Sequence, residues 1–304
     1  DPRSDEVRVD VRACGVNPCD SLRREGLWGD DLPLIPGSDL AGVVEAVGDD
    51  APFDVGDRVL GTVPMLNRSG SRGDRQGVYA ERAVVRADRL ARLPDDTGFE
   101  AGAALGLVGC TAWRALVELG RLDPGETCLV HGGSGGVGHV AVQLAAARGA
   151  RVLATASEAN RETVAGFGAD AVFDYSLDEA ALAAEVDAAA PGGVDVTLDH
   201  RFGDYAQFDV DVAAPGGRVM VIGGNHDQPT VTDLTEAIGK DVTIQPFDVF
   251  NLADVGGTLA RLAGLVADGD LSASVARTYD LDEAAAAHRA VDGDSFVGKL
   301  VIVP

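Results

Sequence analysis

An apolar strand that runs into a glycine cluster constrains this chain more than any other feature. Thr127 to Val130 read as a strand, His131-Gly-Gly-Ser-Gly-Gly-Val-Gly138 follows, and small and apolar residues continue to Ala147. Gly133, Gly135 and Gly138 fit the pattern G-x-G-x-x-G. In that pattern one glycine permits the tight turn, one lets the backbone approach a pyrophosphate, and one lets the helix pack closely on the strand.

The start of the following helix adds free N–H groups and a partial positive charge, which suit phosphates. The sequence therefore predicts a dinucleotide-binding loop made of Gly133, Ser134, Gly135, Gly136, Val137 and Gly138. The alternative is a close-packed βαβ turn that holds no ligand.

Strand and helix patterns alternate after this loop. Strand candidates are Arg151–Thr155, Ala171–Asp174, Val194–Asp199, Arg218–Gly223 and Val242–Phe247, with helical patterns between them. Such alternation predicts a doubly wound parallel sheet, so the fold class is α/β. Residues 1–100 read instead as short strands separated by Gly, Pro and Asp clusters, and residues 271–304 read as strand, helix and strand that return to this first domain. We therefore expect one domain from 1–100 with 271–304, and a second from 101–270.

The strongly negative charge of the chain limits the kinds of molecule that it can bind. The net charge is −24 and lysine occurs only at Lys240 and Lys299. Such a surface repels nucleic acid and anionic membranes. We interpret it as adapted to molar salt in a halophilic organism; the alternative is an ordinary acidic cytosolic protein. The four cysteines lack C-x-x-C spacing, and no apolar run approaches the ~18 residues of a membrane helix, which together predict a reducing, cytoplasmic compartment.

Several further motifs occur in a recognisable order. They are Cys14–Asp20, Pro36–Gly48, Gly56–Val59, Gly77–Glu81, Val194–Asp199, Gly216–Val219 and Gly298-Lys299. With the glycine loop, they make the chain resemble the medium-chain dehydrogenase/reductase superfamily, and within it the zinc-independent quinone oxidoreductases of the zeta-crystallin-like group. The resemblance implies a GroES-like β domain beside a Rossmann domain, with the active cleft between them.

The resemblance also bears on zinc. Zinc dehydrogenases of this superfamily have a Cys where this chain has Asn17, and Gly-His-Glu where it has Gly37-Ser-Asp39. Asn and Ser are poor zinc ligands, and zinc needs three or four good ones. The structural-zinc lobe has no counterpart between Val63 and Gly77. Cys19 and Asp39 remain as possible donors, but we expect no metal site.

Cofactor choice depends on the end of the second Rossmann strand. NAD enzymes hold an acidic residue there for the ribose hydroxyl, whereas this chain has Ala156. Ser157 could donate to a 2′-phosphate and Arg161 could pair with it, so NADPH is the expected cofactor. Glu158 lies two residues past the expected position and could still reach a ribose hydroxyl, and Arg161 could be an ordinary surface charge. The resemblance adds Tyr175 as a contact on the adenosine side.

Near the nicotinamide, the resemblance points to Asn17, Thr111, Ile222, Gly223, Phe250, Phe296, Gly298 and Lys299. Asn17 is the best polar candidate for a catalytic role, because its amide could donate to a substrate carbonyl oxygen as hydride arrives. Its alternative role is that of a turn residue before Pro18. His131 is expected to complete the hydrogen bonding of the glycine loop.

Together these features predict an NADPH-dependent, zinc-independent reductase of quinones or α,β-unsaturated carbonyl compounds, with the final proton supplied by water. Two alternatives stay open: a zinc-dependent alcohol or sugar dehydrogenase, and a nucleotide-binding protein without significant turnover. Val242-Thr-Ile-Gln245 reads as an exposed edge strand, which invites pairing. The resemblance implies a homodimer joined at that edge.

Overall fold

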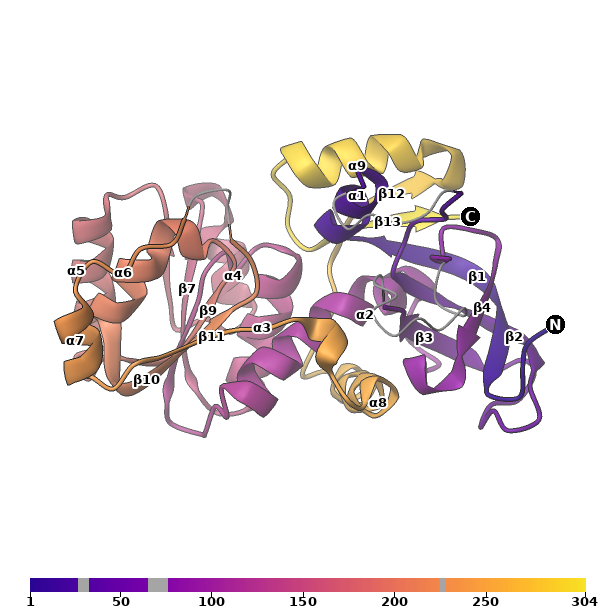
Figure 1. Ribbon diagram of the computed structural model, residues 1–304, viewed down its shortest axis with the longest axis horizontal. Helices are drawn as coiled ribbons and strands as arrows, with labels where there is room; N and C mark the ends of the chain where they lie inside the picture. Colours follow the sequence, from indigo (N-terminus) through magenta and orange to yellow (C-terminus); the bar gives the residue numbers. More distant parts are fainter. Residues whose placement is uncertain (27–32, 65–75, 225–227) are drawn as a thin grey trace. The chain divides into compact units, whose positions relative to one another are not determined.

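The chain folds into two compact units. The computed structural model describes residues 1–26, 33–64, 76–224 and 228–304 (Figure 1). The first unit contains Asp1–Cys110 and Leu252–Pro304, and the second contains Thr111–Asn251.

A seven-stranded sheet forms the first unit. Its strands follow the order β12-β13-β1-β2-β3-β5, and β4 pairs with β1. The strands are β1 (Glu6–Val16), β2 (Asp39–Val47), β3 (Arg58–Thr62), β4 (Arg82–Arg86), β5 (Leu90–Arg92), β12 (Val275–Asp280) and β13 (Lys299–Val303). The helices assigned to this unit are α1 (Pro18–Arg24), α8 (Val255–Ala267), α9 (Ala284–Gly293) and most of α2 (Phe99–Trp113), with short turns η1 (Ala87–Arg89) and η5 (Leu281–Glu283).

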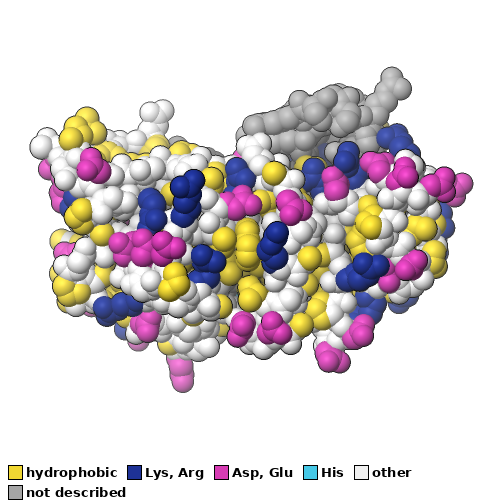
Figure 2. Space-filling view, turned by 90° about the horizontal axis from the view of Figure 1, so that it is seen from below, with side chains coloured by type: hydrophobic (Ala, Val, Ile, Leu, Met, Phe, Trp, Pro, Cys, Tyr) yellow, Lys and Arg dark blue, Asp and Glu magenta, His cyan; other side chains and the backbone are white. Residues whose placement is uncertain are grey.

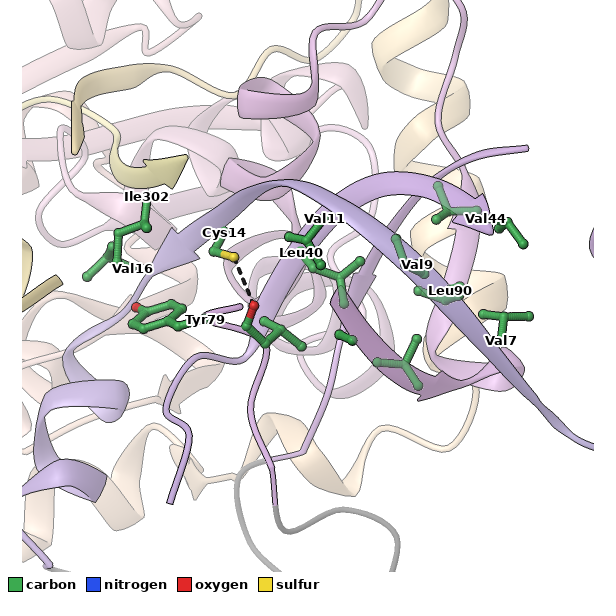
Figure 3. Packing of buried hydrophobic residues seen from close by; sticks show 14 of the residues in the cluster. Val7, Val9, Val11, Cys14, Val16, Leu40, Val44, Tyr79, Leu90 and Ile302 are labelled. Carbon is green, nitrogen blue, oxygen red and sulfur yellow. Dashed lines mark hydrogen bonds between the residues drawn. The ribbon is translucent and has the colours of Figure 1, made fainter. Parts of the chain in front are cut away.

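The core of this unit follows from the alternation of β1. Val7, Val9 and Val11 point to one face and are buried, whereas the residues between them are less buried. They pack with side chains from β2 and β5, as Figure 3 shows for Leu40, Val44 and Leu90, while Ile302 of β13 lies beside Val16 at the other end of β1. The Cys14 Sγ donates to the Val78 carbonyl oxygen over 3.1 Å, which is the dashed line in Figure 3.

A six-stranded parallel sheet forms the second unit, in the order β11-β10-β9-β6-β7-β8. The strands are β6 (Thr127–Val130), β7 (Arg151–Ala156), β8 (Ala171–Asp174), β9 (Val194–Asp199), β10 (Ala213–Val221) and β11 (Thr243–Pro246). The remaining elements are α3 (Gly136–Ala147), α4 (Arg161–Gly166), α5 (Glu179–Ala189), α6 (Phe202–Val212), α7 (Leu234–Gly239), and the turns η2 (Arg114–Leu119), η3 (Glu158–Asn160) and η4 (Val249–Asn251).

The strand order reverses at β6, because β7 and β8 extend the sheet on one side and β9 to β11 on the other. In open α/β sheets, ligands bind outside the carboxyl ends of the strands at such a switch point. The predicted α/β class, with a mixed sheet in one unit and a parallel sheet in the other, is confirmed.

Helix α8 packs on a different sheet from the one that its position in the sequence suggests. Residues 254–268 fall inside the stretch 101–270 that the sequence pattern joins to the parallel sheet. In the structure, α8 packs on β3, β5 and η1 of the first unit and buries Val255, Leu259 and Leu262. A methyl group at Gly256 would lie 3.0 Å from the Asp88 and Leu90 carbonyl oxygens, so this packing is close. An amphipathic stripe specifies burial, but not the partner.

The segment Phe99–Leu119 is the helical run, among the described residues, long and apolar enough to cross a membrane by length and composition. It joins α2 to the π-helical turn η2, and 67% of its apolar window is buried inside the structure. A core helix has the same composition. The run is not evident from the sequence, because Gly, Ala and Thr residues interrupt its bulky apolar side chains.

Acidic and basic side chains are interspersed over the face in Figure 2. Lysine contributes little to that surface. Lys299 is buried, and the Lys240 Nζ donates to the Asp211 carbonyl oxygen over 2.6 Å and pairs with Glu236 over 2.9 Å.

Candidate functional site

The glycine loop lies between the carboxyl end of β6 and the start of α3. Gly132 has a φ of +67°, which favours glycine, and its carbonyl accepts from the Gly135 N–H over 2.9 Å. The Gly133 N–H donates to the Thr155 carbonyl over 2.8 Å, and this ties the loop to β7. Gly135 then precedes the first residue of α3 in an extended conformation. The predicted residues Gly133 to Gly138 therefore span the turn after β6 and the first turn of α3, at the switch point of the sheet.

The loop is shaped for close approach. A Cβ atom at Gly138 would lie 2.0 Å from the Gly132 carbonyl oxygen, and one at Gly133 would lie 2.8 Å from Val164. The contact at Gly138 is with backbone and excludes a side chain there, whereas a side chain at Gly133 would require Val164 to shift. The tight turn and the open start of α3 fit the pyrophosphate of a dinucleotide, which needs backbone N–H groups without side chains in front of them.

The carboxyl ends of β7 and β8 hold the predicted adenosine-side residues. Ala156 is fully buried, whereas Ser157 begins η3 and Tyr175 is 48% exposed just beyond β8. The Arg161 guanidinium donates to the Glu158 carboxylate over 2.9 Å, with both side chains on the surface. A 2′-phosphate bound by Arg161 would therefore compete with Glu158.

Asn160 is a residue that sequence reasoning missed here. Its Nδ2 donates to the Ser134 Oγ over 3.4 Å, so it links the adenosine-side segment to the glycine loop. Its signal in the sequence was weak, since a lone Asn between two predicted elements is an ordinary loop residue.

The remaining predicted residues of the second unit lie at separate places within it. Thr111 is buried in α2 and already interacts with another group of the protein. Ile222 follows β10, and its N–H donates to the Asp199 carbonyl oxygen over 2.9 Å, while the Gly223 carbonyl accepts from the Phe202 N–H over 3.4 Å. Phe250 lies in η4 and is half-buried.

In the first unit, Asn17 lies at the centre of a buried polar cluster. It caps α1, and its backbone N–H donates to the Asp20 carboxylate over 2.9 Å. Its Nδ2 donates to Asp39 over 2.8 Å and to the Ser38 Oγ over 3.2 Å. Its Oδ1 accepts from the Lys299 ammonium over 2.5 Å. With 1% exposure and both amide hydrogens engaged, Asn17 would have to give up an existing bond before donating to a substrate.

Two buried carboxylates and one ammonium make this cluster. The Lys299 Nζ also donates to the Val16 carbonyl over 2.5 Å, and Asp39 Oδ1 accepts from the Leu107 N–H over 2.7 Å. Burial raises the pKa of Asp20 to about 6, with the Asp39 charge adding to the rise, and burial also raises the pKa of Asp39. Burial lowers the pKa of Lys299, against the opposing attraction of both carboxylates.

Lys299 was expected to contact the cofactor, and the structure places its ammonium inside this cluster. Two other predicted cofactor contacts that precede Lys299 in the sequence, Gly298 and Phe296, are not among the residues that form this cluster. Gly298 has a φ of +83°, and Phe296 lines an open surface hollow with Ser274–Arg277 and Gly293–Val297. Among the described residues, no group of three or more His, Cys, Asp or Glu side chains is arranged to hold a metal ion. Most of the stretch between Val63 and Gly77 lies outside the described residues.

A second buried polar cluster lies beneath the glycine loop. The His131 Nε2 is 3.0 Å from an Asp209 carboxylate oxygen, and its ring stacks on Tyr205 at a centroid distance of 4.3 Å. The Thr155 Oγ1 is 3.4 Å from the His131 Nδ1 and accepts from the Gly132 N–H over 3.0 Å. Burial lowers the pKa of His131 to about 4, so its ring is neutral near pH 7.

Comparison with known proteins places this architecture in a family. Residues 3–95 match the family model described as alcohol dehydrogenase GroES-like domain, and residues 136–264 match the one described as zinc-binding dehydrogenase. The quinone oxidoreductase of Mus musculus is 34% identical over 320 residues, covering 99% of this chain and 90% of the mouse protein. The human quinone oxidoreductase is 32% identical, with the same coverage.

Solved structures of similar fold support the same family. An alcohol dehydrogenase superfamily protein from Novosphingobium aromaticivorans has a TM-score of 0.89 at 33% identity, covering 100% of this chain and 93% of its own. A mycobacterial protein solved in complex with NADPH has a TM-score of 0.87 at 28% identity, covering 100% and 92%. The chain therefore belongs to the medium-chain dehydrogenase/reductase superfamily and is an oxidoreductase. Quinone oxidoreductases are among its full-length relatives.

Proposed function

We propose that this protein is an NADPH-dependent, zinc-independent reductase of quinones or α,β-unsaturated carbonyl compounds, of the zeta-crystallin-like kind. The observation that carries the proposal is the closely packed glycine loop at the switch point of the parallel sheet, followed by a β7 that ends on the neutral Ala156. The quinone oxidoreductases among its relatives, and the NADPH complex of a structural neighbour, support it.

NADPH would supply the hydride, and the chain would bind and orient it. The loop from Gly133 to Gly138 would hold the pyrophosphate through N–H groups at the start of α3, with Ser134 beside them, since the Gly133 and Gly135 N–H groups already donate within the fold. Ser157, Arg161 and Tyr175 would hold the adenosine end. The further contacts we propose are Thr111, Ile222, Gly223, Phe250, Phe296, Gly298 and Lys299, with Asn17 at the reacting end.

Cofactor preference is the first test. Arg161→Ala should weaken NADPH binding by about 1–3 kcal/mol, the value of a charge-assisted contact, and leave NADH binding unchanged. Glu158→Gln should strengthen NADPH binding, because Arg161 then loses its competing carboxylate. Arg151→Ala is the matched control, since Arg151 is exposed at the opposite end of β7. Fluorescence titration with both dinucleotides measures this, and equal losses for NADPH and NADH would refute the assignment.

Zinc independence rests on the polar cluster of the first unit. Asn17 and Ser38 are poor zinc ligands, and the ammonium of Lys299 already lies against Asn17 near Asp39. Purified protein should therefore contain no stoichiometric zinc and keep its activity in EDTA. Stoichiometric zinc bound through Cys19 or Asp39 would favour the alcohol or sugar dehydrogenase alternative instead.

We also propose a cytoplasmic homodimer that binds neither nucleic acid nor membrane. Its interface would lie on β11, the edge strand of the parallel sheet. The preceding helix α7 exposes Leu234 by 65% and Ile238 by 67%. An edge strand beside exposed apolar side chains is a typical site of strand pairing between two copies.

A further inference from the structure

Three ionisable side chains are buried beneath the glycine loop. His131 follows β6, Asp199 is the last residue of β9, and Asp209 lies in α6. Asp199 and Asp209 have no exposed surface and His131 has 3%. A charge buried in this way is costly unless it is paired, so the number of protons in the cluster matters.

The two carboxyl groups lie close enough to interact, since the Asp209 charge adds to the rise in the pKa of Asp199 that burial causes. Two carboxylates can only accept, so a bond between them requires a proton on one of them. Counted as carboxylates among the described residues, Asp199 Oδ2 and Asp209 Oδ2 are each buried without a donor. One shared proton satisfies both atoms. The other oxygens already have donors, because Asp199 Oδ1 accepts from the Arg201 N–H over 2.6 Å and Asp209 Oδ1 lies 3.0 Å from His131.

The direction of the remaining bonds follows. With Asp209 Oδ1 as the acceptor, the neutral His131 carries its hydrogen on Nε2, and its Nδ1 then accepts from the Thr155 hydroxyl. The Thr155 oxygen in turn accepts from the Gly132 N–H. A continuous chain of hydrogen bonds therefore runs from the Gly132 N–H through Thr155 and His131 to Asp209, and each donor in it has one acceptor.

Other charged or titratable groups face this chain of bonds. They are Tyr205, stacked on the His131 ring, and His200, Arg201 and Asp204, at the start of α6. Tyr205 stays neutral near pH 7 because burial raises its pKa. Asp204 is paired with Arg201 over 2.5 Å.

We propose that Asp199 and Asp209 share one proton and that His131 and Thr155 couple this proton to the conformation of the glycine loop, which makes His131 and Thr155 positioning residues for dinucleotide binding. The inference rests on the proposed function, in that the loop must bind a dinucleotide. Since the loop contacts the pyrophosphate common to NADPH and NADH, the coupling acts equally on both.

The coupling predicts the direction in which dinucleotide affinity changes with pH. Burial, with the neighbouring Asp209 charge second, raises the pKa of Asp199 to about 7. Since this folded-state pKa lies above the usual value, the stabilising proton is present at low pH and is lost as pH rises through about 7. Burial raises the pKa of Asp209 as well. Loss of the proton at Asp199 therefore leaves a buried negative charge on the pair, which alters the bond from His131 to Asp209 and with it the loop geometry. We expect the affinity for both dinucleotides to fall about tenfold between pH 6.5 and 9, which is one pKa unit of coupling.

Three variants separate coupling from stability. Thr155→Val removes the hydroxyl that joins His131 to the loop while keeping the side-chain shape. Thr155→Ser keeps the hydroxyl. Asp199→Asn mimics the protonated pair, because its amide can donate to Asp209 Oδ2 while its oxygen accepts from the Arg201 N–H. The measurements are dissociation constants for NADPH and NADH and melting temperatures, each from pH 6.5 to 9.

Thr155→Val should bind both dinucleotides more weakly and without pH dependence, while its melting temperature still falls with rising pH. Thr155→Ser should recover the wild-type pH profile, and Asp199→Asn should be flat in both binding and melting. A wild-type protein with pH-independent affinity, or a Thr155→Val variant that keeps the wild-type slope, would overturn the coupling. Absence of dinucleotide binding at every pH would instead overturn the proposed function, and with it this inference.

Discussion

Replacement of Lys299 by Met is the sharpest perturbation of the polar cluster in the first unit. The Lys299 side chain is buried, and its ammonium donates to the Asn17 Oδ1 and to the Val16 carbonyl. Met has a similar length and no charge. The substitution therefore removes the only ammonium near Asp20 and Asp39 among the described groups, and takes one donor from each of the Asn17 and Val16 oxygens.

The size of the effect follows from burial. Lys299 attracts both buried carboxylates without a direct ion pair among the described contacts. The range we use is that for removing one partner of a buried ion pair, about 3–5 kcal/mol, because here too an uncompensated charge remains. A buried acceptor left without a donor costs about 1–3 kcal/mol when counted alone, and part of this is contained in the first figure. We expect Lys299→Met to lower the free energy of unfolding by about 3–5 kcal/mol at pH 8.

The loss should shrink at lower pH. Lys299 opposes the rise in pKa of both carboxyls, so its removal raises both values further. Protons then neutralise the two groups at a higher pH than in the wild type, and the penalty is smaller at pH 5 than at pH 8. The double variant Lys299→Met with Asp39→Asn should recover part of the loss, since one buried charge is removed.

Urea denaturation of the full chain in molar KCl, at pH 5 and pH 8, measures these differences. Lys240→Met is the matched control, because Lys240 is the chain's other lysine and lies nearer the surface. We expect it to cost no more than about 2 kcal/mol, with little pH dependence. A Lys299→Met variant within about 1 kcal/mol of the wild type at pH 8 would refute the buried-cation account.

Three other outcomes are expected. Gly138→Ala should abolish dinucleotide binding, because its Cβ would lie 2.0 Å from the Gly132 oxygen, whereas Gly166→Ala, with nothing within 4 Å, should leave binding unchanged in the same titration. Melting temperature and activity should rise from dilute buffer to molar KCl, because the net charge is −24 and the Debye length falls from about 10 Å at 0.1 M to about 3 Å at 1 M; equal stability in dilute buffer and in 2 M KCl would remove the halophile interpretation. Light scattering in high salt should show a dimer that Ile238→Glu dissociates, and a wild-type monomer would contradict the proposed interface.

The sequence predicted well what depends on local pattern. The glycine loop lies between a strand and a helix because its small residues and the flanking apolar runs follow one another directly in the chain. The six parallel strands were found for the same reason, apart from the early start of β10 at Ala213. The assignment of α8 was not available from its own residues, since an apolar stripe fits either sheet.

The sequence did not predict in which direction individual side chains point. Lys299 lies beside a glycine with positive φ, as expected for a turn, but only the register of β13 against β1 reveals that its ammonium reaches Val16 and Asn17. Asp209 is a second example. An acid between Phe208 and Val210 in a helix was a visible sign of a buried polar role, yet its partner His131 is 78 positions away. Such pairs depend on tertiary packing, which local patterns do not contain.

The most direct measurement of the central claim is stopped-flow oxidation of NADPH by the EDTA-treated protein in molar KCl, with a panel of quinones and enones. The account predicts that NADPH is oxidised with at least one quinone or enone, more efficiently than NADH, at a rate unchanged by added zinc. Turnover that requires zinc, or tight dinucleotide binding without oxidation by any member of the panel, would contradict it.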